Sequence, residues 1–293
     1  MNDLTLFVAT TPGLEAITAR EVTGTLPHRP IEIQAGGIEL RGSVLDAFAL
    51  NLRLATASRV LIRMAEFRAA HFGEVEKQAA RIDWGRWLAP GQAVTWAVTS
   101  RKSRLYHTGA IGERLFAAAR SAVAGIAEAD TSTAFGEGAR IVVRVVRDRF
   151  TVSFDTSGQH LHERGDRVLA GAAPLRETMA AALLSASGWT RSRPLFDPMC
   201  GSGTVVLEAA RRATSRAPGL GRTFAIARLP LFQGAPAREA ESLREAARAA
   251  QHPALAPIVG RDRDPAAIDA ARANVKAAGF GDAVDLEIRA VSS

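Results

Sequence analysis

Asp197-Pro198-Met199-Cys200-Gly201-Ser202-Gly203-Thr204 is the stretch that decides the fold expected for the C-terminal part of the chain. It joins a short β-type run, Leu195–Asp197, to the apolar helical pattern of Thr204–Ala213. Two glycines permit a tight turn and a close backbone approach to a ligand, and the N–H groups that open the next helix attract an anion. The stretch predicts a strand-turn-helix unit carrying a small-ligand site, with an ordinary two-glycine turn as the alternative.

The flanking sequence repeats the same alternation. A helical pattern, Leu175–Ala186, precedes the stretch, and Ile258–Asp262, Pro265–Ala278 and Val284–Ile288 follow it as strand, helix and strand. This βαβα order is typical of a doubly wound parallel sheet. We therefore expect residues 159–293 to form the N-terminal half of a Rossmann-like domain.

A carboxylate stands at the end of the next predicted strand. Asp262 is placed to accept the two ribose hydroxyl protons of a nucleotide-like ligand. Asp264 precedes Pro265 and is interpreted as the N-cap of the following helix. A dinucleotide fingerprint would need a third glycine where Val206 stands, so an NAD-dependent oxidoreductase is the disfavoured alternative.

The glycine stretch also resembles a known family. Together with Glu208-Ala209-Ala210 it is similar to motif I of the THUMP-containing class I methyltransferases that modify large-subunit ribosomal RNA, and of their transfer-RNA relatives. The likeness covers essentially the whole chain. Its other stretches are Thr11–Glu15, Gly36–Ile38, Asn51–Leu52, Ala57–Leu61, Asp155–Gly158, Leu161–His162, Arg164–Gly165, Ala173–Thr178 and Ala217–Leu220.

The resemblance implies S-adenosylmethionine as cofactor. It implies that Gly201 and Gly203, with Ser202 between them, cradle the methionine part and that Asp262 holds the ribose. Asp197 and Thr178 are then expected to orient the amino and carboxylate groups. The implied reaction is methyl transfer to the exocyclic amine of a guanine in RNA, with 23S ribosomal RNA preferred over transfer RNA.

The N-terminal two thirds predict an α+β architecture. The resemblance implies a ferredoxin-like region over residues 1–55 and a THUMP-like RNA-binding domain over residues 56–158, followed by the polar stretch Asp155–Pro174 at the boundary. The expected elements alternate between strands and helices. They are Leu4–Thr10, Leu14–Val22, Ile31–Ile33, Ile38–Arg41, Ser43–Leu54, Arg59–Phe67, Phe72–Ala80, Ala93–Thr99, Ala110–Ala124, Ile141–Val146 and Phe150–Phe154.

Charge favours a polyanionic partner without proving one. The net charge of +7 and the pI near 10.7 fit RNA binding, although an ordinary Arg-rich surface explains them equally well. We expect Arg101, Lys102, Arg104 and Arg114 to contact RNA phosphates, each with a solvated surface role as the alternative. Three tryptophans are interpreted as core residues rather than base-stacking residues, namely Trp84, Trp87 and Trp96.

Other chemistry finds little support in the sequence. The single cysteine, Cys200, excludes an intrachain disulfide and a cysteine-rich zinc module, and is interpreted as a small loop residue rather than a nucleophile. The pair His160 and His162 with Glu163 is too small a ligand set for a predicted metal site. No segment has the length of a membrane span, so we expect a cytoplasmic protein, of open oligomeric state.

One element of the family pattern does not occur in the 293 residues. The resemblance implies an Asn/Asp-Pro-Pro-aromatic motif that holds the target amine, and this sequence contains none. We therefore assign no catalytic residue and expect a C-terminally truncated relative or a fragment, inactive alone. A non-catalytic RNA-binding relative and a transfer-RNA guanine methyltransferase are the alternatives.

Overall fold

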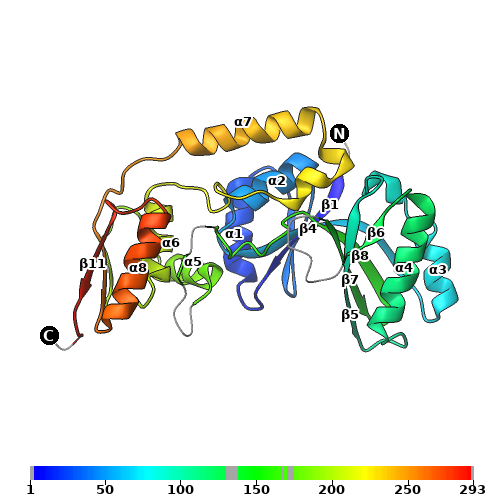
Figure 1. Cartoon of the computed structure of the whole chain (residues 1–293), viewed down its shortest axis with the longest axis horizontal. Coiled ribbons are helices and arrows are strands. Elements are labelled where there is room, and N and C mark those ends of the chain that lie inside the picture. The colour runs from blue at the N-terminus through cyan, green and yellow to red at the C-terminus, as the bar shows by residue number, and fades with distance from the viewer. Residues whose placement is uncertain (1–2, 130–137, 166–167, 170–174, 292–293) are drawn as a thin grey trace.

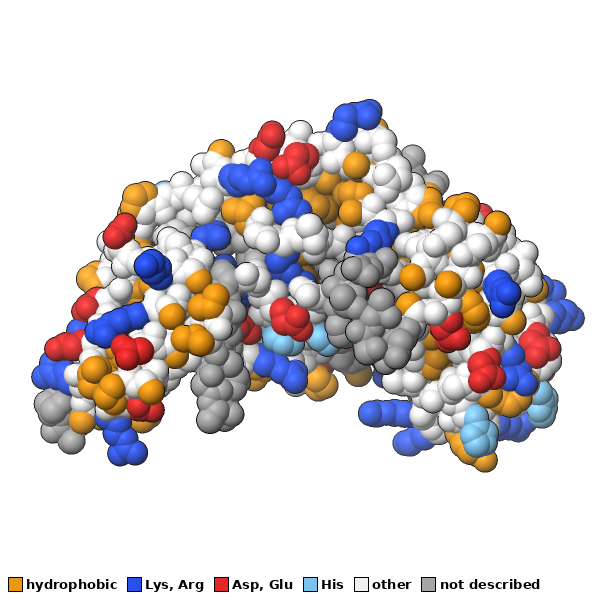
Figure 2. Space-filling view, viewed as in Figure 1, with side chains coloured by type: hydrophobic (Ala, Val, Ile, Leu, Met, Phe, Trp, Pro, Cys, Tyr) orange, Lys and Arg blue, Asp and Glu red, His pale blue; other side chains and the backbone are white. Residues whose placement is uncertain are grey.

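The structure is a computed structural model that describes residues 3–129, 138–165, 168–169 and 175–291. The strands of these residues form an eight-stranded sheet and a three-stranded sheet, each with its own hydrophobic core. The three-stranded sheet lies toward the left of Figure 1 and the strands β5–β8 toward the right. The molecular outline is an arch, with a hollowed lower face in the same view (Figure 2).

The first part has the ferredoxin-like order β-α-β-β-α-β. Its strands lie in the order β2-β3-β1-β4, and every neighbouring pair is antiparallel. A capping box starts α2, because Ser43 accepts from the Asp46 N–H while Asp46 accepts from the Ser43 N–H. The elements are β1 Leu4–Thr10, α1 Glu15–Thr25, β2 Ile31–Gln34, β3 Gly37–Gly42, α2 Val44–Arg53 and β4 Ala57–Arg68.

Strand β4 carries the sheet into the next part. Its first half pairs with β1 and most of its length pairs with β8, so the sheet continues as β4-β8-β7-β5-β6. The elements are α3 Phe72–Ala79, β5 Ala93–Arg101, α4 Thr108–Ala122, β6 Ala127–Glu128, β7 Ala139–Val146 and β8 Arg149–Asp155. The boundary expected between residues 55 and 56 therefore separates two parts that share one continuous sheet. It stays a prediction as a domain boundary.

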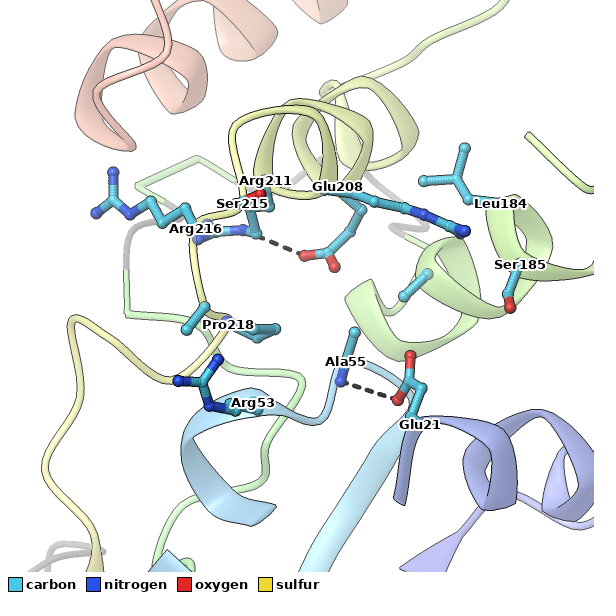
Figure 3. Close-up of a pocket in the computed structure, with 13 residues that line it drawn as sticks. Glu21, Arg53, Ala55, Leu184, Ser185, Glu208, Arg211, Ser215, Arg216 and Pro218 are labelled. Carbon is cyan, nitrogen blue, oxygen red and sulfur yellow. Dashed lines mark hydrogen bonds and ion pairs between the residues drawn. The ribbon is translucent and has the colours of Figure 1, made fainter. Parts of the chain in front are cut away.

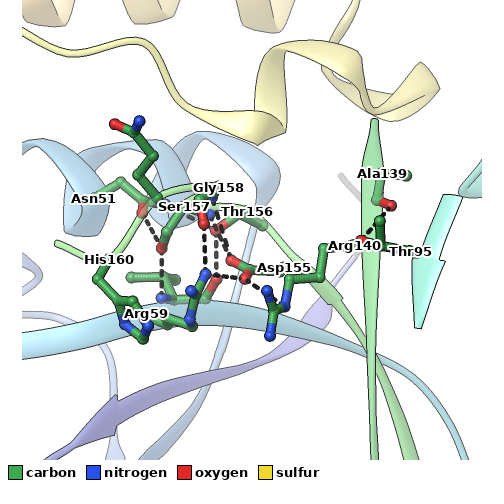
Figure 4. Close-up of polar contacts among 12 residues, drawn as sticks. Asn51, Arg59, Thr95, Ala139, Arg140, Asp155, Thr156, Ser157, Gly158 and His160 are labelled. Carbon is green, nitrogen blue, oxygen red and sulfur yellow. Dashed lines mark hydrogen bonds and ion pairs between the residues drawn. The ribbon is translucent and has the colours of Figure 1, made fainter. Parts of the chain in front are cut away.

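A buried polar network fixes the end of β8 (Figure 4). The Asp155 carboxylate pairs with Arg59 and accepts from the Ser157 N–H at 2.9 Å. Asn51 donates to Thr156 Oγ1 at 2.8 Å and accepts from Ser157 Oγ at 2.6 Å. All five side chains are buried, so β8, β4 and α2 are locked together where the chain leaves the large sheet.

The C-terminal part has the predicted parallel sheet. Strands lie in the order β11-β10-β9, and both neighbouring pairs are parallel. The elements are α5 Glu177–Ala186, β9 Leu195–Asp197, α6 Thr204–Ala213, β10 Ile258–Asp262, α8 Pro265–Ala277 and β11 Val284–Ile288. The Rossmann-like arrangement expected from the sequence is confirmed for these residues.

One segment of this part packs away from its own sheet. The short helices η2 Ala225–Arg228 and η3 Pro230–Phe232 lead into α7 Ala235–Ala249, which spans the top of the molecule over α2 (Figure 1). Phe224 and Phe232 each place their ring centroid 5.7 Å from that of Phe48. Residues that the sequence assigned to the unit 159–293 therefore contribute to the core of the larger sheet.

The sequence did not predict α7. Its apolar face contacts α2, which lies almost 200 residues earlier in the chain. Within the part of the chain that the structure describes, no helix is both long enough and apolar enough to span a membrane.

Candidate functional site

The glycine loop lies at the carboxyl end of β9, as predicted. Gly201 and Gly203 have φ values of 55° and 88°, which side chains with a Cβ rarely adopt. A Cβ on Gly203 would lie 3.2 Å from the Ala271 Cβ of α8, whereas one on Gly201 would meet nothing within 4 Å. The loop thus packs tightly against α8 at Gly203 and has open space over Gly201.

Asp262 lies beside this loop at the carboxyl end of β10. Its Oδ2 accepts from the Gly201 N–H at 2.9 Å, and its Oδ1 accepts from the Asp264 N–H at 3.0 Å. Asp264 in turn accepts from the Ala266 N–H at 2.9 Å, so its predicted N-cap role is confirmed. A carboxylate offers about four acceptor positions. Asp262 therefore holds the loop and keeps capacity for ligand hydroxyls.

A second carboxylate lies close to the first. Asp197 ends β9 and accepts from the Met199 N–H at 3.1 Å. Burial raises the pKa of Asp197, and the nearby Asp262 charge raises it further. Two carboxylates this close favour a ligand that brings positive charge.

The other two predicted cofactor residues lie in the same region of the fold. Thr178 is buried in the first turn of α5, which packs against α6, the helix that follows the glycine loop. Ser202 is buried between the two glycines, and its carbonyl accepts from Asn274 Nδ2 at 3.1 Å. Asn274 was not singled out from the sequence, where it is one polar residue in an Ala-rich helix.

Family models match both parts of the chain. Residues 164–292 match the RMKL-like methyltransferase domain, and residues 5–61 match the RlmL ferredoxin-like domain. The Synechocystis protein slr0064, named as an RNA methyltransferase, is 30% identical over 292 residues, which are 96% of this chain and 75% of that protein. The chain belongs to the RlmK/L-like RNA methyltransferase family.

Other members of this family are longer than the chain. YpsC of Bacillus subtilis, also named as an RNA methyltransferase, is 33% identical over 233 residues, covering 76% of this chain and 58% of YpsC. The ribosomal RNA large subunit methyltransferase K/L of Methylococcus capsulatus is 33% identical over 296 residues, covering 96% of this chain and 39% of that protein. The chain thus spans less than two thirds of either relative.

Solved structures share the fold across the whole chain. SMU.472, described as a methyltransferase and crystallised with S-adenosylhomocysteine, has a TM-score of 0.87 at 26% identity and covers 99% of this chain and 76% of its own. A Listeria monocytogenes protein described as an N6-adenine-specific DNA methylase has a TM-score of 0.88 at 29% identity. The match covers 100% of this chain and 76% of that protein's chain. These likenesses agree with a ferredoxin-like unit followed by a Rossmann-like methyltransferase domain.

Cys200 lies in the glycine loop, directly before Gly201. Burial raises the pKa of its thiol to about 12, and the Asp197 and Asp262 charges act in the same direction. The thiol is therefore protonated at neutral pH and is a poor nucleophile. Its interpretation as a small loop residue agrees with this chemistry.

Three of the four predicted RNA-contacting cations lie together. Arg101, Lys102 and Arg104 are exposed where β5 ends, and the Arg104 N–H donates to Asp148 Oδ1 at 2.7 Å. Arg114 lies elsewhere, on α4, where its Nε is 3.1 Å from Glu76 Oε1 and its guanidinium lies 4.0 Å from the Phe72 ring centroid. The structure thus groups the first three and places Arg114 against α3.

Sequence reasoning missed two exposed residues at this basic tip, which we define as Arg101, Lys102, Arg104, Tyr106 and Arg147. Tyr106 is 68% exposed, and its ring centroid lies 4.2 Å from that of His107. Arg147 joins the tip because its N–H donates to the Arg101 carbonyl at 3.3 Å. The sequence offered one indication of Tyr106: it is the only tyrosine of the chain and follows Arg104 by two residues.

The tryptophans are core residues, as predicted. Trp84 and Trp87 are buried, and Trp96 is half-buried, with its ring packed edge-on against Trp84 at 5.8 Å. None of the three is among the exposed large side chains of the described residues. Base stacking on these rings would require the core to open.

The paired histidines form a stacked pair rather than a ligand cluster. The rings of His160 and His162 lie 5.3 Å apart. Burial, with Arg59 and His162 adding to it, lowers the pKa of His160 to about 4. In the described ranges no group of three or more His, Cys, Asp or Glu could hold a metal ion.

A cavity of about 370 Å³ lies between the two cores (Figure 3). Its wall includes Glu208, which pairs with Arg164 at 3.2 Å and with Arg211 at 3.3 Å, all three side chains being buried. Arg164 also donates to the Ala55 carbonyl at 2.6 Å, so this ion group ties α6 to the ferredoxin-like part. Arg53 in the last turn of α2 and Arg211 and Arg212 in the last turn of α6 also line the cavity, where each lies near the negative end of its helix dipole.

Proposed function

We propose that this chain binds S-adenosylmethionine as part of an RNA methyltransferase that modifies the exocyclic amine of a guanine in 23S ribosomal RNA. One observation carries the cofactor assignment: the glycine loop and Asp262 meet at one edge of the sheet, joined by the 2.9 Å bond from the Gly201 N–H. Carboxyl ends of adjacent parallel strands form the usual ligand crevice of such sheets.

The residues present fit the proposed cofactor. Open space over Gly201 leaves room for the amino-acid end, and the Asp197 and Asp262 carboxylates suit a ligand with a sulfonium and an ammonium group. In this proposal Asp262 binds the ribose hydroxyls, and Asp197 and Thr178 orient the amino and carboxylate groups. When bound, the cofactor supplies an electrophilic methyl group.

Titration calorimetry with S-adenosylmethionine, S-adenosylhomocysteine and NADH tests the cofactor. We expect the first two to bind and NADH to show no binding, because Val206 stands where a dinucleotide site needs its third glycine. Binding rather than turnover is the measure, since the 293 residues include no Asn/Asp-Pro-Pro-aromatic motif. Absence of binding by both sulfur ligands overturns the proposal.

The RNA part of the proposal draws on the relatives' names and on the basic tip. Large-subunit ribosomal RNA is the substrate in the name of the Methylococcus capsulatus relative. Transfer RNA is the second candidate, because the motif I likeness extends to the transfer-RNA enzymes. Filter binding to 23S ribosomal RNA fragments and to transfer RNA at equal salt separates the two, and preference for transfer RNA would favour the second.

Removing positive charges from the basic tip tests whether this surface contacts RNA. We expect Arg101→Ala with Lys102→Ala and Arg104→Ala to reduce the slope of log Kd against log salt by about 2 to 3, since each phosphate contact contributes roughly 0.7 to 0.9. The matched control removes three exposed arginines elsewhere, Arg238, Arg248 and Arg272, and leaves the slope nearly unchanged. Equal slopes for the two triple variants would place the RNA on another surface.

A further inference from the structure

Both polar atoms of the Asn274 side-chain amide make their hydrogen bonds within the protein. It lies on α8, is 0% exposed, and accepts at Oδ1 from the Val168 and Leu169 N–H groups at 3.0 and 2.9 Å. Its Nδ2 donates to the Leu169 carbonyl at 2.8 Å and to the Ser202 carbonyl at 3.1 Å. Two donors face Oδ1 and two acceptors face Nδ2, so only one orientation of the amide satisfies all four partners.

These partners come from segments that are far apart in the sequence. Ser202 is the middle residue of the glycine loop, 72 positions before Asn274, and Leu169 lies 105 positions before it. Residues 168–169 precede α5, the helix that carries Thr178. One side chain therefore ties the glycine loop of the proposed cofactor site and residues 168–169 to α8.

Packing holds residues 168–169 only in part. The side chains of Val168 and Leu169 are 61% and 49% exposed, so about half of their apolar surface stays in contact with solvent. The glycine loop rests on the same face of α8 through Gly203 and Ala271, and Ala271 lies three residues before Asn274. The amide thus attaches both segments to the same face of α8.

We infer that Asn274 is a positioning residue of the cofactor site, holding the glycine loop and residues 168–169 in the geometry that receives the ligand. Two residues of this loop have positive φ values, and ordering a flexible loop on binding costs affinity. Asn274 orders it in advance. The inference rests on the proposed function, because it concerns the affinity for S-adenosylmethionine.

Calorimetry with S-adenosylhomocysteine on Asn274→Ala, Asn274→Asp and Val275→Ala tests the inference. Val275 is the matched control, since it is buried on the same helix in the same core but has an apolar side chain that makes no hydrogen bond. We expect Asn274→Ala to raise Kd at least tenfold. Asn274→Asp keeps the shape and the oxygen that accepts from the Val168 and Leu169 N–H groups, so it raises Kd less. Val275→Ala lowers Tm and leaves Kd within twofold.

The outcomes distinguish this inference from the proposed function. If the unaltered protein does not bind the ligand, the proposed function fails and the inference with it. If the unaltered protein binds and both Asn274 variants lower Tm without changing Kd, the residue is structural only and the inference alone is overturned. Should Asn274→Ala fail to fold, the milder Asn274→Asp variant decides between these results.

Discussion

Asp262→Ala is expected to weaken binding of S-adenosylmethionine by about a hundredfold. In the proposed site the carboxylate accepts both ribose hydroxyls, and a hydrogen bond to a charged group contributes about 1.5 to 3 kcal/mol. Two such bonds near the lower value amount to roughly 3 kcal/mol, or about two powers of ten in Kd. The Gly201 and Asp264 N–H groups lose their acceptor as well. Titration calorimetry measures the change in Kd.

Asp269→Ala is the matched control for this prediction. Asp269 lies on the adjacent α8, its side chain is 72% exposed, and its partner is Arg272 at 3.4 Å. Its removal should leave the Kd unchanged within about twofold, since exposed ion pairs contribute little. An Asp262→Ala protein that folds normally and binds as tightly as the unaltered protein would remove Asp262 from the cofactor site.

Asp155→Ala is expected to lower the free energy of unfolding by about 3 to 5 kcal/mol, because it leaves the buried Arg59 guanidinium without its counter-charge. Asp155 is 0% exposed and also accepts from the Ser157 N–H at 2.9 Å, which would lose its partner too. The variant therefore disrupts the network that locks β8 to β4 (Figure 4). Urea denaturation at neutral pH gives the difference in free energy.

Asp285→Ala provides the comparison for an exposed ion pair. Asp285 pairs with Arg261 at 2.7 Å, but its side chain is 64% exposed, so a loss of only about 0 to 1 kcal/mol is expected. If Asp155→Ala lost no more stability than Asp285→Ala, burial of the Arg59–Asp155 pair would not govern the strength of this junction.

Most elements followed from local pattern. The β-rich run Leu4–Thr10 and the apolar helical pattern of Thr204–Ala213 predicted β1 and α6 at their observed bounds, because both are apolar enough to be buried on most of their surface. Helix α7 was not predicted, although its Ala-, Glu- and Arg-rich sequence favours a helix locally; only its packing on the distant α2 lies beyond local pattern. The meeting of the glycine loop with Asp262 was predictable, because adjacent parallel strands bring their carboxyl ends to one edge.

The sequence by itself determined the family, the two kinds of sheet and the loop that carries the cofactor proposal, because these depend on short-range spacing and on turns that only glycine adopts easily. The tertiary structure alone decided that α7 returns to the first core, that Arg114 lies apart from the basic tip, and that Asn274 joins two distant segments. These features depend on which surfaces meet in space. Hydrogen bonds across 72 and 105 residues leave no periodic trace in a single sequence.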